Sequence, residues 1–592
     1  MPGARLVRSA IVALFLATLF ASPPARAAAD WIEVSNAHTH WLLGRQAQFN
    51  PEFIGQQGYD GVDEDITRFG PDRLTRLIAA GEANVAELER RRDAAEDSRV
   101  RQDLEIMLAS VDRNLRSARL NRELAVPYVS VPRIVFVGLS ALLDPQVPEA
   151  RRAAAAVRLR RYVGAESGYE PITEDARGMM EDRFEVDGLV WPYRVQLEQD
   201  LQNTPRFLAG IRQLFESLGP AGYEADLATL EAQFEAWDEW VRSAILPRAR
   251  DGFRLPEALY ALSLEQFGVR ASPASLIEDA TAAYAGIRNE MIALADLVAA
   301  ERGWEDDDYR AVIRRLKTER FEDDNILEAY HAANEALEAI IRREDIVSIP
   351  PRDVSIRMKT PAEEAALPAP SLQPPRLVGN TGEVVEFLLP SPGAGDDGPD
   401  DFIFEATAWT LAAHELRPGH ELQFSTMLET GVSDARATFA FNSVNVEGWA
   451  LYAEAEIKPY LPLEGQLIGL QHRLMRAARA FLDPMLNTGQ VSIAEARRIL
   501  VEEVVLSPHM AEMEIQRYTF RAPGQATSYF YGYQLLQGLR TRTEIVLGEA
   551  FDRRAFHDFI LRQGLLPPAL IERAVVEEFI PSRTVLVGRN TL

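Results

Sequence analysis

The feature that most constrains the fold is a helical spacing of apolar residues that recurs through long stretches of the chain. Apolar side chains stand three and four residues apart, with few glycines or prolines between them. That period matches the α-helix, whereas a half-buried strand alternates every second residue. The sequence therefore predicts a mainly α-helical fold, a large multi-helix body. The clearest stretches are residues 72–124, 224–245, 275–300 and 325–343.

A change in composition divides the chain after its first 348 residues. Seven prolines fall between residues 349 and 376. Proline blocks the continuation of a helix and pushes the preceding residue towards extended geometry. We expect residues 349–376 to connect a helical N-terminal region, residues 30–348, to a second helical region, residues 377–592. The connector need not separate independent domains, and we expect one continuous structural unit.

The first 29 residues have the pattern of an export signal. Arg5 and Arg8 give a positive start, residues 10–21 are apolar, and residues 25–29 offer a small-residue cleavage site. The apolar run of about 12 residues is too short to span a bilayer of ~30 Å as a helix. No later segment has enough apolar residues to cross a membrane. The mature protein is expected to be periplasmic or secreted, without stable membrane insertion.

Charge and cysteine content exclude several functions. The formal net charge is −26, whereas nucleic-acid binding requires clustered Lys and Arg, so we expect no nucleic-acid partner. The sequence contains no cysteine, which excludes disulfides, thiolate ligands, cysteine nucleophiles and an acyl anchor on cysteine. It also has no Gly-x-Ser-x-Gly elbow and no glycine-rich phosphate loop, which disfavours serine catalysis and nucleotide chemistry.

One short motif points to metal chemistry. Residues 414–420 read His-Glu-Leu-Arg-Pro-Gly-His, and Glu447 follows 27 positions later. Two imidazoles and a carboxylate suit Zn²⁺ and leave a fourth position for water. The metal lowers the pKa of that water from roughly 16 to about 7, and the neighbouring Glu415 can take its proton. The motif predicts a single-zinc hydrolase with His414, His420 and Glu447 as ligands.

The two histidines are six residues apart, a spacing that an unbroken helix cannot use. At about 100° per residue, their side chains would point about 240° apart. Pro418 cannot donate to the carbonyl of His414, and Gly419 permits non-helical dihedral angles, so a distortion there would turn His420 towards the metal. Without that break, Glu421 would be the second ligand, because it lies about 20° off the face of His414.

A small β element is expected just before the motif. Residues 383–389 form the best strand candidate in the chain, and a free strand edge can pair with an extended peptide. Residues 391–401, rich in glycine, proline and aspartate, predict a loop, and a helix should follow into His414. Further helices are expected over residues 447–457, after the N-cap residues Ser492 and Ser507, and over residues 526–547 and 553–562.

Three blocks of sequence, in order, resemble the bacterial domain-of-unknown-function 885 family. The first is His-Glu-x-x-Pro-Gly-His-x-Leu-Gln at residues 414–423, and the second is Glu-Gly-Trp-Ala-Leu-Tyr-Ala-Glu at residues 447–454. The third comprises Arg517-Tyr518, Pro523-Gly524-Gln525-Ala526, Tyr529 and Gly532. The family is similar to the thermolysin-type (gluzincin) zinc peptidases. That similarity implies a zincin-like fold, in which a metal-binding helix lies beside the β element.

Carried over to the matching positions, the resemblance implies a role for each motif residue. The ligands would be His414, His420 and, on a following helix, Glu447. Glu415 would be the general base, which requires its carboxylate to lie within hydrogen-bonding reach of the attacking water. Ligand chemistry alone gives the same assignments.

Several other polar residues have two interpretations each. Tyr529 and Arg517 are candidate catalytic residues, because a phenol or guanidinium can donate to an oxyanion or a substrate carboxylate. They could equally be a buried tyrosine and a structural arginine. Glu454, seven residues after Glu447, shares its helical face and would either orient a histidine ligand or face solvent. His38 and His40, near the N-terminus of the mature chain, could chelate a metal, but two alternate histidines in an exposed segment are usually incidental.

Two positions depart from the family pattern. Family members often carry a second histidine directly after Pro-Gly-His, where this chain has Glu421. This leaves the second ligand open between His420 and Glu421. Near Asp483 the family pattern ends in a histidine, where this chain has Asn487, which suggests altered substrate contacts or a weakened site.

The leading prediction is an exported zinc metallopeptidase, a Zn²⁺-dependent hydrolase of amide bonds that acts on short peptides. Its expected partner is therefore a peptide or another amide substrate. One alternative is a catalytically inactive, metal-stabilised binding protein of the envelope. Another is a hydrolase of non-peptide amides such as cell-wall fragments. The sequence leaves open the substrate, the metal and the oligomeric state.

Overall fold

The computed structural model describes residues 25–322, 325–367, 369–390 and 401–584. The predicted export signal lies outside these ranges except for residues 25–29, which belong to the first described helix. The predicted loop at residues 391–401 also lies outside them, apart from Asp401.

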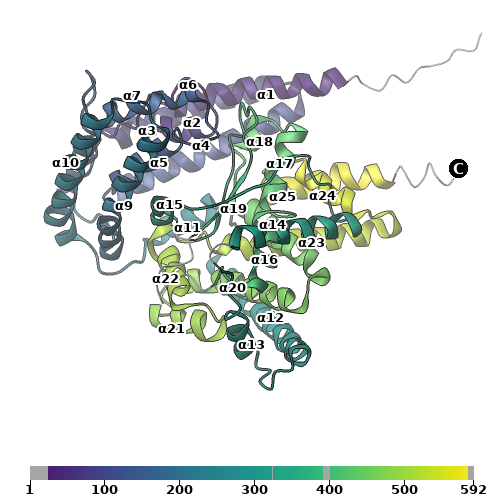
Figure 1. Ribbon diagram of the computed structural model, residues 1–592. Coiled ribbons are helices and arrows are strands. Elements are labelled where there is room, and N and C mark those ends of the chain that lie inside the picture. Colours follow the sequence, from purple (N-terminus) through teal and green to yellow (C-terminus); the bar gives the residue numbers. More distant parts are fainter. Residues whose placement is uncertain (1–24, 323–324, 368, 391–400, 585–592) are drawn as a thin grey trace, which may run out of the picture.

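Helices build most of the described chain, which confirms the prediction of a mainly helical fold (Figure 1). Before the Pro-rich segment they are α1 (Ala25–Gln46), α2 (Pro51–Gln56), α3 (Arg73–Ala94), α4 (Ser98–Leu124), α5 (Val131–Ser140), α6 (Glu149–Arg152), α7 (Ala154–Tyr162), α8 (Ile172–Glu181), α9 (Arg194–Leu218), α10 (Glu224–Trp240), α11 (Glu257–Gln266), α12 (Pro273–Arg302), α13 (Tyr309–Leu316) and α14 (Ile326–Arg343). From that segment onward they are α15 (Pro361–Ala366), α16 (Glu405–Glu415), α17 (His420–Thr430), α18 (Asp434–Ala437), α19 (Ser443–Ile457), α20 (Leu463–Asn487), α21 (Ile493–Arg498), α22 (Pro508–Gln516), α23 (Thr527–Leu547), α24 (Arg553–Leu561) and α25 (Pro568–Ala574).

The ends of the long helices follow local sequence chemistry. Helix α12 begins where the Ser272 side chain accepts a hydrogen bond from the amide of Ser275, with Pro273 in the first turn. It ends at Gly303, whose left-handed φ of 66° suits a residue without a Cβ atom. The predicted helix at residues 72–124 is two helices, because Asp97 caps the start of α4 and separates it from α3.

The strand predicted at residues 383–389 is confirmed as β3 (Glu386–Leu389), but its predicted free edge is wrong. Strand β3 is the centre of a three-stranded sheet in the order β1-β3-β2. Strand β1 (Ser355–Met358) pairs with it in parallel and β2 (Ser371–Gln373) antiparallel, so both of its edges are occupied. The two outer strands come from the Pro-rich segment, where prolines shorten each strand and weaken its sequence pattern.

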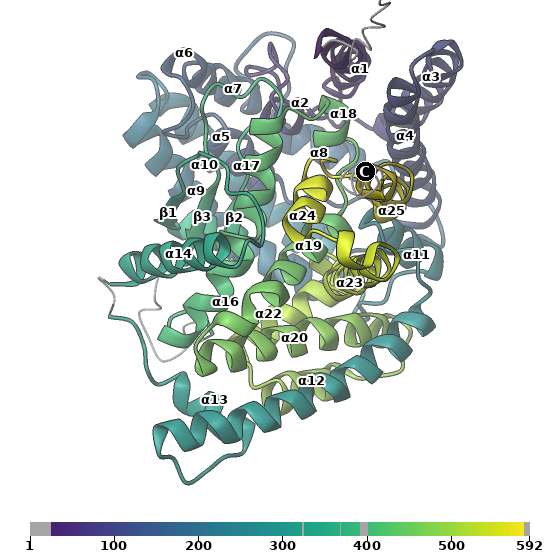
Figure 2. The ribbon, with the colours of Figure 1, turned by 90° about the vertical axis from the view of Figure 1, so that its right-hand side faces the viewer.

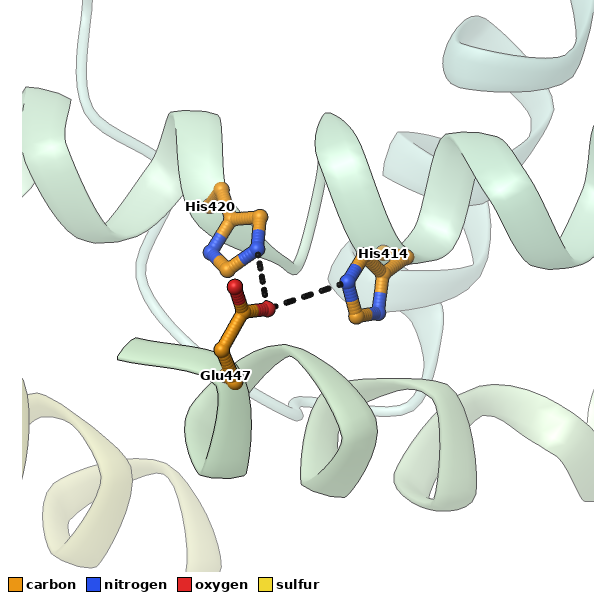
Figure 3. A group of neighbouring side chains, drawn as sticks. All are labelled: His414, His420 and Glu447. Carbon is orange, nitrogen blue, oxygen red and sulfur yellow. Dashed lines mark ion pairs between the residues drawn. The ribbon is translucent and has the colours of Figure 1, made fainter. Parts of the chain in front are cut away.

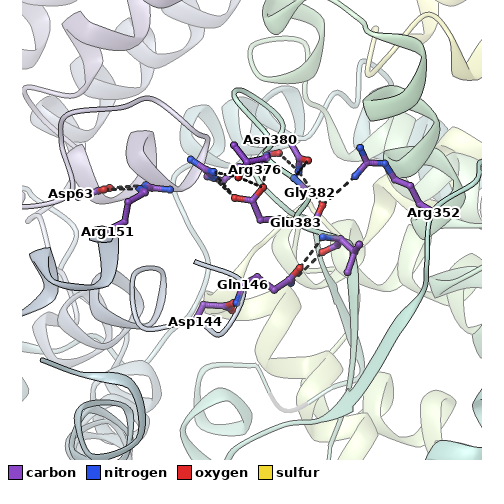
Figure 4. A network of polar contacts seen from close by, with 11 residues as sticks. Asp63, Asp144, Gln146, Arg151, Arg352, Arg376, Asn380, Gly382 and Glu383 are labelled. Carbon is purple, nitrogen blue, oxygen red and sulfur yellow. Dashed lines mark hydrogen bonds and ion pairs between the residues drawn. The ribbon is translucent and has the colours of Figure 1, made fainter. Parts of the chain in front are cut away.

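The Pro-rich segment is therefore part of the packed body, and a polar network fixes the chain that follows it (Figure 4). The Gln146 side chain pairs with both the amide and the carbonyl of Val384, at 2.8 and 3.3 Å. Arg352 donates to the carbonyl of Glu383, whose carboxylate accepts from Arg376. These bonds join the chain entering β3 to the loop between α5 and α6.

The largest hydrophobic core runs through both halves of the chain. It includes Leu42 and Leu104 from before the Pro-rich segment, and Leu474 and Phe579 from after it. Helix α20 is buried along nearly its whole length and packs on α12, which lies beneath it in Figure 2. Helix α19 packs across α23 and also against α16, so the helices that carry the motif lie deep in the molecule.

None of the helices in the described ranges is long and apolar enough to cross a membrane.

Candidate metal centre

His414, His420 and Glu447 converge on one point, as Figure 3 shows. Each offers one ligand atom, and these three atoms lie within 4.8 Å of one another. The Glu447 carboxylate oxygen lies 3.3 Å from Nε2 of His420 and 3.6 Å from Nε2 of His414. Both histidines are buried, whereas 17% of the Glu447 side chain is exposed. In the described part of the chain, this is the group of His, Asp and Glu residues with metal-ligand geometry.

The break between the two histidines is the one that their six-residue spacing requires. Helix α16 ends at Glu415 and α17 begins at His420. A Cβ atom on Gly419 would lie 1.8 Å from the carbonyl oxygen of His414, so only glycine allows the chain to fold back this closely. The indole of Trp449 on α19 donates to the carbonyls of Pro418 and Gly419 and holds the turn against α19.

Glu421, the alternative second ligand, points away from the cluster. Its carboxylate accepts from Arg417 at 2.6 Å and from Ser425 at 2.6 Å, and its side chain is fully buried. Arg417 also binds Glu338 on α14 at 2.6 Å. Because the break rotates α17 relative to α16, His420 faces the cluster and Glu421 anchors the turn.

A close helix crossing brings Glu447, the predicted third ligand, towards the two histidines. A Cβ atom on Gly532 of α23 would lie 2.1 Å from the carbonyl oxygen of Val444, and one on Gly448 would lie 2.7 Å from the backbone of Gly532. The two glycines therefore let α19 and α23 pack backbone to backbone. This crossing sets Glu447, next to Gly448, near Tyr529, one turn before Gly532.

A buried carboxylate, that of Glu454, binds the ring nitrogen of His414 that does not face Glu447. Glu454 accepts from Nδ1 of His414 at 2.6 Å and from the Thr410 hydroxyl at 3.1 Å, and Arg476 of α20 lies 3.2 Å from it. This contact leaves Nε2 of His414 to face Glu447. A carboxylate that binds the far nitrogen of a histidine is the usual support of a metal-ligating imidazole.

The ionisable groups of the cluster shift one another's pKa values. Burial and the Arg476 guanidinium act to lower the pKa of His414, but hydrogen bonds with Glu447 and Glu454 outweigh them and raise it to about 9. Burial acts to raise the pKa of Glu447, yet bonds from the two histidines hold it well below its usual value. Burial raises the pKa of Glu415, against the opposing attraction of His414 and His420. The Glu415 carboxylate therefore interacts electrostatically with the cluster.

Tyr529 flanks the ligands, and Arg517 lies behind it. The Tyr529 ring is stacked with that of His414, with centroids 6.3 Å apart and planes at 12°. Its hydroxyl accepts from Arg517 at 3.2 Å. The Arg479 guanidinium lies 4.6 Å from the Tyr529 ring centroid and makes two 2.7 Å bonds to Glu514. Burial acts to raise the pKa of Glu514, but Arg479 and Arg517 lower it to about 2.

Asn487, which replaces the family histidine, has a structural contact. It donates to the Asp483 carboxylate at 3.1 Å and to the carbonyl of Tyr518 at 3.1 Å. Asp483 also accepts from the Gly524 amide and from Tyr260, and burial raises its pKa to about 7. Through these bonds α20 fixes the loop that leads to Tyr529.

The supporting residues on α20 were missed by the sequence analysis. His472, Arg476, Arg479 and Asp483 are buried, and their spacing of four, three and four residues puts them on one face of the helix. A polar stripe along an otherwise apolar helix is the signal that would have found them. It indicates a buried partner for each charge, because unpaired charges are costly in a core.

The donor set and two of the three distances between ligand atoms suit a zinc ion, and all three atoms lie within 4.8 Å of one another. Tetrahedral ligands at bond lengths of about 2.0–2.1 Å lie about 3.3–3.4 Å from each other, close to the 3.3 and 3.6 Å measured from Glu447 to the two imidazoles. Two nitrogens and one carboxylate oxygen form the donor set of a catalytic site with an open fourth position. The hydrogen bond between Glu454 and Nδ1 of His414 is the support that metal-ligating histidines usually have.

The other histidines singled out in the sequence lie elsewhere. His38 contacts Arg91 at 3.1 Å, and His40 pairs with Asp434 at 2.9 Å, so the two do not share a ligand.

The chain belongs to the family described as bacterial protein of unknown function, DUF885, whose model matches residues 51–575. This confirms the family that the sequence blocks indicate.

Two solved structures have a similar fold. One is a proposed lipoprotein of unknown function from Shewanella oneidensis, 18% identical, with a TM-score of 0.71 over 92% of this chain and 99% of that chain. The other is a proposed lipoprotein from Colwellia psychrerythraea, 17% identical, with a TM-score of 0.75 over 93% and 99%. At these identities the likeness shows the fold alone. No curated protein matches the chain.

Proposed function

We propose that this protein is an exported zinc-dependent hydrolase of amide bonds that acts as a peptidase on short peptides. The observation that carries the proposal is the convergence of His414, His420 and Glu447. Glu415, next to His414 in the sequence, interacts electrostatically with both histidines. Two imidazoles, a carboxylate and an adjacent free carboxylate are the parts of a metal-assisted hydrolytic site.

Each protein group has one task in this mechanism. Zinc, when bound by the three ligands, supplies a Lewis acid that polarises a carbonyl and lowers the pKa of water. Glu415 accepts the proton of the attacking water and returns it to the leaving amine. The Tyr529 hydroxyl donates to the oxygen on which negative charge develops, and Arg517 holds that hydroxyl in place.

The resemblance to thermolysin-type peptidases extends to the order of these parts. In that clan the third ligand is a glutamate on a following helix, and here Glu447 lies on α19 after the histidines of α16 and α17. The break at Pro418-Gly419 replaces the continuous helix on which that clan carries histidines four residues apart. A zincin-like site built on two helix ends is therefore part of the proposal.

Burial of the cluster supports small substrates. The imidazoles of His414 and His420 are almost fully buried, and 17% of the Glu447 side chain is exposed. A folded protein cannot bring its backbone to such a point, whereas a short peptide can. The export pattern of residues 1–29 and the description of both structural relatives as proposed lipoproteins support a place in the envelope or outside the cell.

The test combines metal analysis with one conservative substitution. The purified mature protein should contain one zinc per chain and cleave members of a short-peptide library, and a chelator should abolish cleavage. Glu415→Gln should keep the zinc and lose activity by at least about 100-fold, the typical share of a general base. Activity that survives this substitution, or that persists in metal-free protein, rules out the proposed mechanism.

Asn487 favours one alternative. Where the family pattern has a titratable imidazole, this chain has an amide that is held by Asp483 and Tyr518. A metal-stabilised binding protein of the envelope would bind zinc stoichiometrically and cleave nothing in the library. Hydrolysis of non-peptide amides such as cell-wall fragments would use the same residues, and a substrate screen separates it from peptidase activity.

A further inference from the structure

Two arginines share one carboxylate beside the metal centre. Arg479 makes two 2.7 Å bonds to Glu514, one to each oxygen, and the Tyr518 hydroxyl donates to the same carboxylate at 2.7 Å. Arg517 lies farther from it, with Nη2 at 3.8 Å, and the two guanidinium groups repel each other. Asp483, four residues after Arg479, bonds to other groups, and burial raises its pKa to about 7. The two arginines therefore carry more positive charge than Glu514 compensates.

One edge of the Arg517 guanidinium has no hydrogen-bond acceptor among the described residues. Nη1 donates to the Tyr529 hydroxyl at 3.2 Å and to Oε1 of Gln525 at 3.5 Å. Nε makes no hydrogen bond in the described ranges, and Nη2 has only the distant Glu514. Neither of these two atoms is fully buried, and 19% of the Arg517 side chain is exposed, compared with 5% for Arg479. Two adjacent donors of this kind can bind both oxygens of a carboxylate.

Tyr529 connects this free edge to the metal centre. Its ring is stacked with that of His414 at a centroid distance of 6.3 Å, and its hydroxyl contacts Arg517 at 3.2 Å. An extended peptide advances about 3.5 Å per residue. A peptide whose scissile carbonyl lies at the histidines can therefore place a carboxylate at Arg517 about one to three residues further along the chain.

Positive charge continues beyond Arg517 in the π-helical turn Arg517–Arg521. Burial and the charge of Arg133 lower the pKa of Arg521, Asp200 acts in the opposite direction, and Arg517 lowers it further. Asp200 accepts from the Tyr128 hydroxyl at 3.0 Å, and burial raises its pKa to about 6. In a chain with a net charge of −26, this local excess of arginine attracts an anion towards Tyr529.

We infer that Arg517, supported by the charge of Arg521, binds the C-terminal carboxylate of the substrate, so that peptides are cleaved near their carboxyl end. The inference rests on the proposed function, because it assigns one end of the substrate to the proposed hydrolytic site. Nε and Nη2 of Arg517 pair with the two carboxylate oxygens, while Nη1 keeps its contact with Tyr529. A peptide that ends in an amide lacks the charge and the second acceptor oxygen that this fork binds.

The first test compares substrates that differ at one end only. The best substrate from the short-peptide library is prepared as the free acid and as the C-terminal amide, each with a free or an acetylated N-terminus. In the zinc-loaded mature protein, kcat/KM should be at least about tenfold higher for the acid than for the amide. Acetylation should change it little. Mass spectrometry should show that about one to three residues leave from the carboxyl end.

The acid-to-amide ratio of kcat/KM isolates the role of Arg517. Arg517→Gln should bring the ratio close to one, whereas Tyr529→Phe should lower kcat for both substrates and leave the ratio unchanged. Arg521→Gln should reduce the ratio by about two- to threefold, less at high salt. Arg497→Gln, which breaks an exposed pair with Glu512, is the control and should change neither quantity. A ratio that Arg517→Gln leaves unchanged overturns the inference.

Binding to metal-free protein separates this inference from the proposed function. Titrated into chelator-treated mature protein, N-acetyl-Leu-Leu should bind at least about tenfold more tightly than N-acetyl-Leu-Leu-amide. Arg517→Gln should remove the difference. Preferential binding of the acid without any cleavage would support the carboxylate site and reject the hydrolase. Equal cleavage of acid and amide, or equal binding of the two probes, would overturn the carboxylate site and leave the hydrolase standing.

Folding of the variants is checked by circular dichroism melting. If Arg517→Gln does not fold, Arg517→Lys keeps the positive charge but lacks the two parallel donors. It should then retain less than half of the preference for the acid over the amide. A full preference in Arg517→Lys, together with an unchanged ratio in Arg521→Gln, would overturn the inference.

Discussion

The two ends of the carboxylate face of α19 have the same residue type in opposite environments. Glu447 is 17% exposed and contacts the two histidines. Glu454, two turns later, is 3% exposed and is bound by His414, Thr410 and Arg476. In the proposed metal site, one helix supplies both a ligand and its support. At the open end the carboxylate contacts both histidines, where the proposal places the cation. At the closed end the carboxylate binds Nδ1 of His414.

Removal of the open-end carboxylate should have the largest effect. In Glu447→Ala we expect zinc affinity to fall by more than about 100-fold, beyond the loss typical of a supporting residue. Elemental analysis after dialysis against buffered zinc measures it. Glu405→Ala, an exposed position on α16, is the control and should retain full zinc. Stoichiometric zinc in Glu447→Ala would remove this residue from the ligand set.

At the closed end, Glu454→Gln should reduce zinc affinity by about 10- to 100-fold, because the imidazole of His414 loses its orienting partner. Breaking the buried pair with Arg476 should also cost about 3–5 kcal/mol in the free energy of unfolding. The double variant Glu454→Gln/Arg476→Met should recover much of that stability, measured by urea denaturation, but not the affinity. If zinc affinity stays unchanged in both, Glu454 has no supporting role.

A buried histidine near the closed end predicts pH dependence. His557 accepts from the Tyr452 hydroxyl of α19 at 2.7 Å and donates to the carbonyl of Ile346 at 2.8 Å. Burial lowers its pKa from 6.5 to about 3. The unfolded chain therefore takes up a proton at a higher pH than the folded chain. This contribution to stability is present above pH 6.5 and is lost as the pH falls towards 3.

The expected loss is about 1.4 kcal/mol per pH unit within that window. Urea denaturation of the wild type and His557→Gln at pH 7.5, 6.5, 5.5 and 4.5 measures it, since the difference between the two proteins cancels the other acidic groups. The wild type should lose about 2 kcal/mol more than the variant between pH 6.5 and 4.5, because the unfolded histidine is already half protonated at pH 6.5. Parallel curves would show that His557 is protonated in the folded protein.

The smallest expected effect concerns Gly532, at the crossing of α19 and α23 that places Glu447. Gly532→Ala should destabilise the protein by about 1–3 kcal/mol, because its Cβ atom would lie 2.1 Å from the carbonyl oxygen of Val444. Gly538→Ala, six residues later on α23, meets only the end of Arg542 at 3.6 Å and should be neutral or stabilising. Thermal melting compares the two. Equal melting temperatures would mean that the crossing relaxes without cost.

Local sequence patterns were enough to predict the mainly helical fold and the N-terminal ends of two helices. The caps at Ser492 and Ser507 were predicted, and both side chains accept the expected amide bonds. The strand at β3 was found because its apolar run is buried on both faces. Its partners β1 and β2 were not, since three- and four-residue strands between prolines have no period to detect.

The candidate site also combines features that local sequence patterns predict with features that they do not. The motif residues and the need for a break between His414 and His420 follow from spacing alone. The choice of His420 over Glu421 depends on how far α17 turns relative to α16, and on the burial of Arg417 beside Glu421. Neither quantity is contained in a local pattern.

The sequence by itself determined the helical architecture, the family and the residues able to bind a metal, because periodicity, caps and ligand chemistry act over short distances along the chain. Only the tertiary structure decided which carboxylate faces the histidines and which one contacts His414 from its other side. Those outcomes depend on packing between helices such as α19, α20 and α23, where burial and the position of distant charges set the role of each polar group.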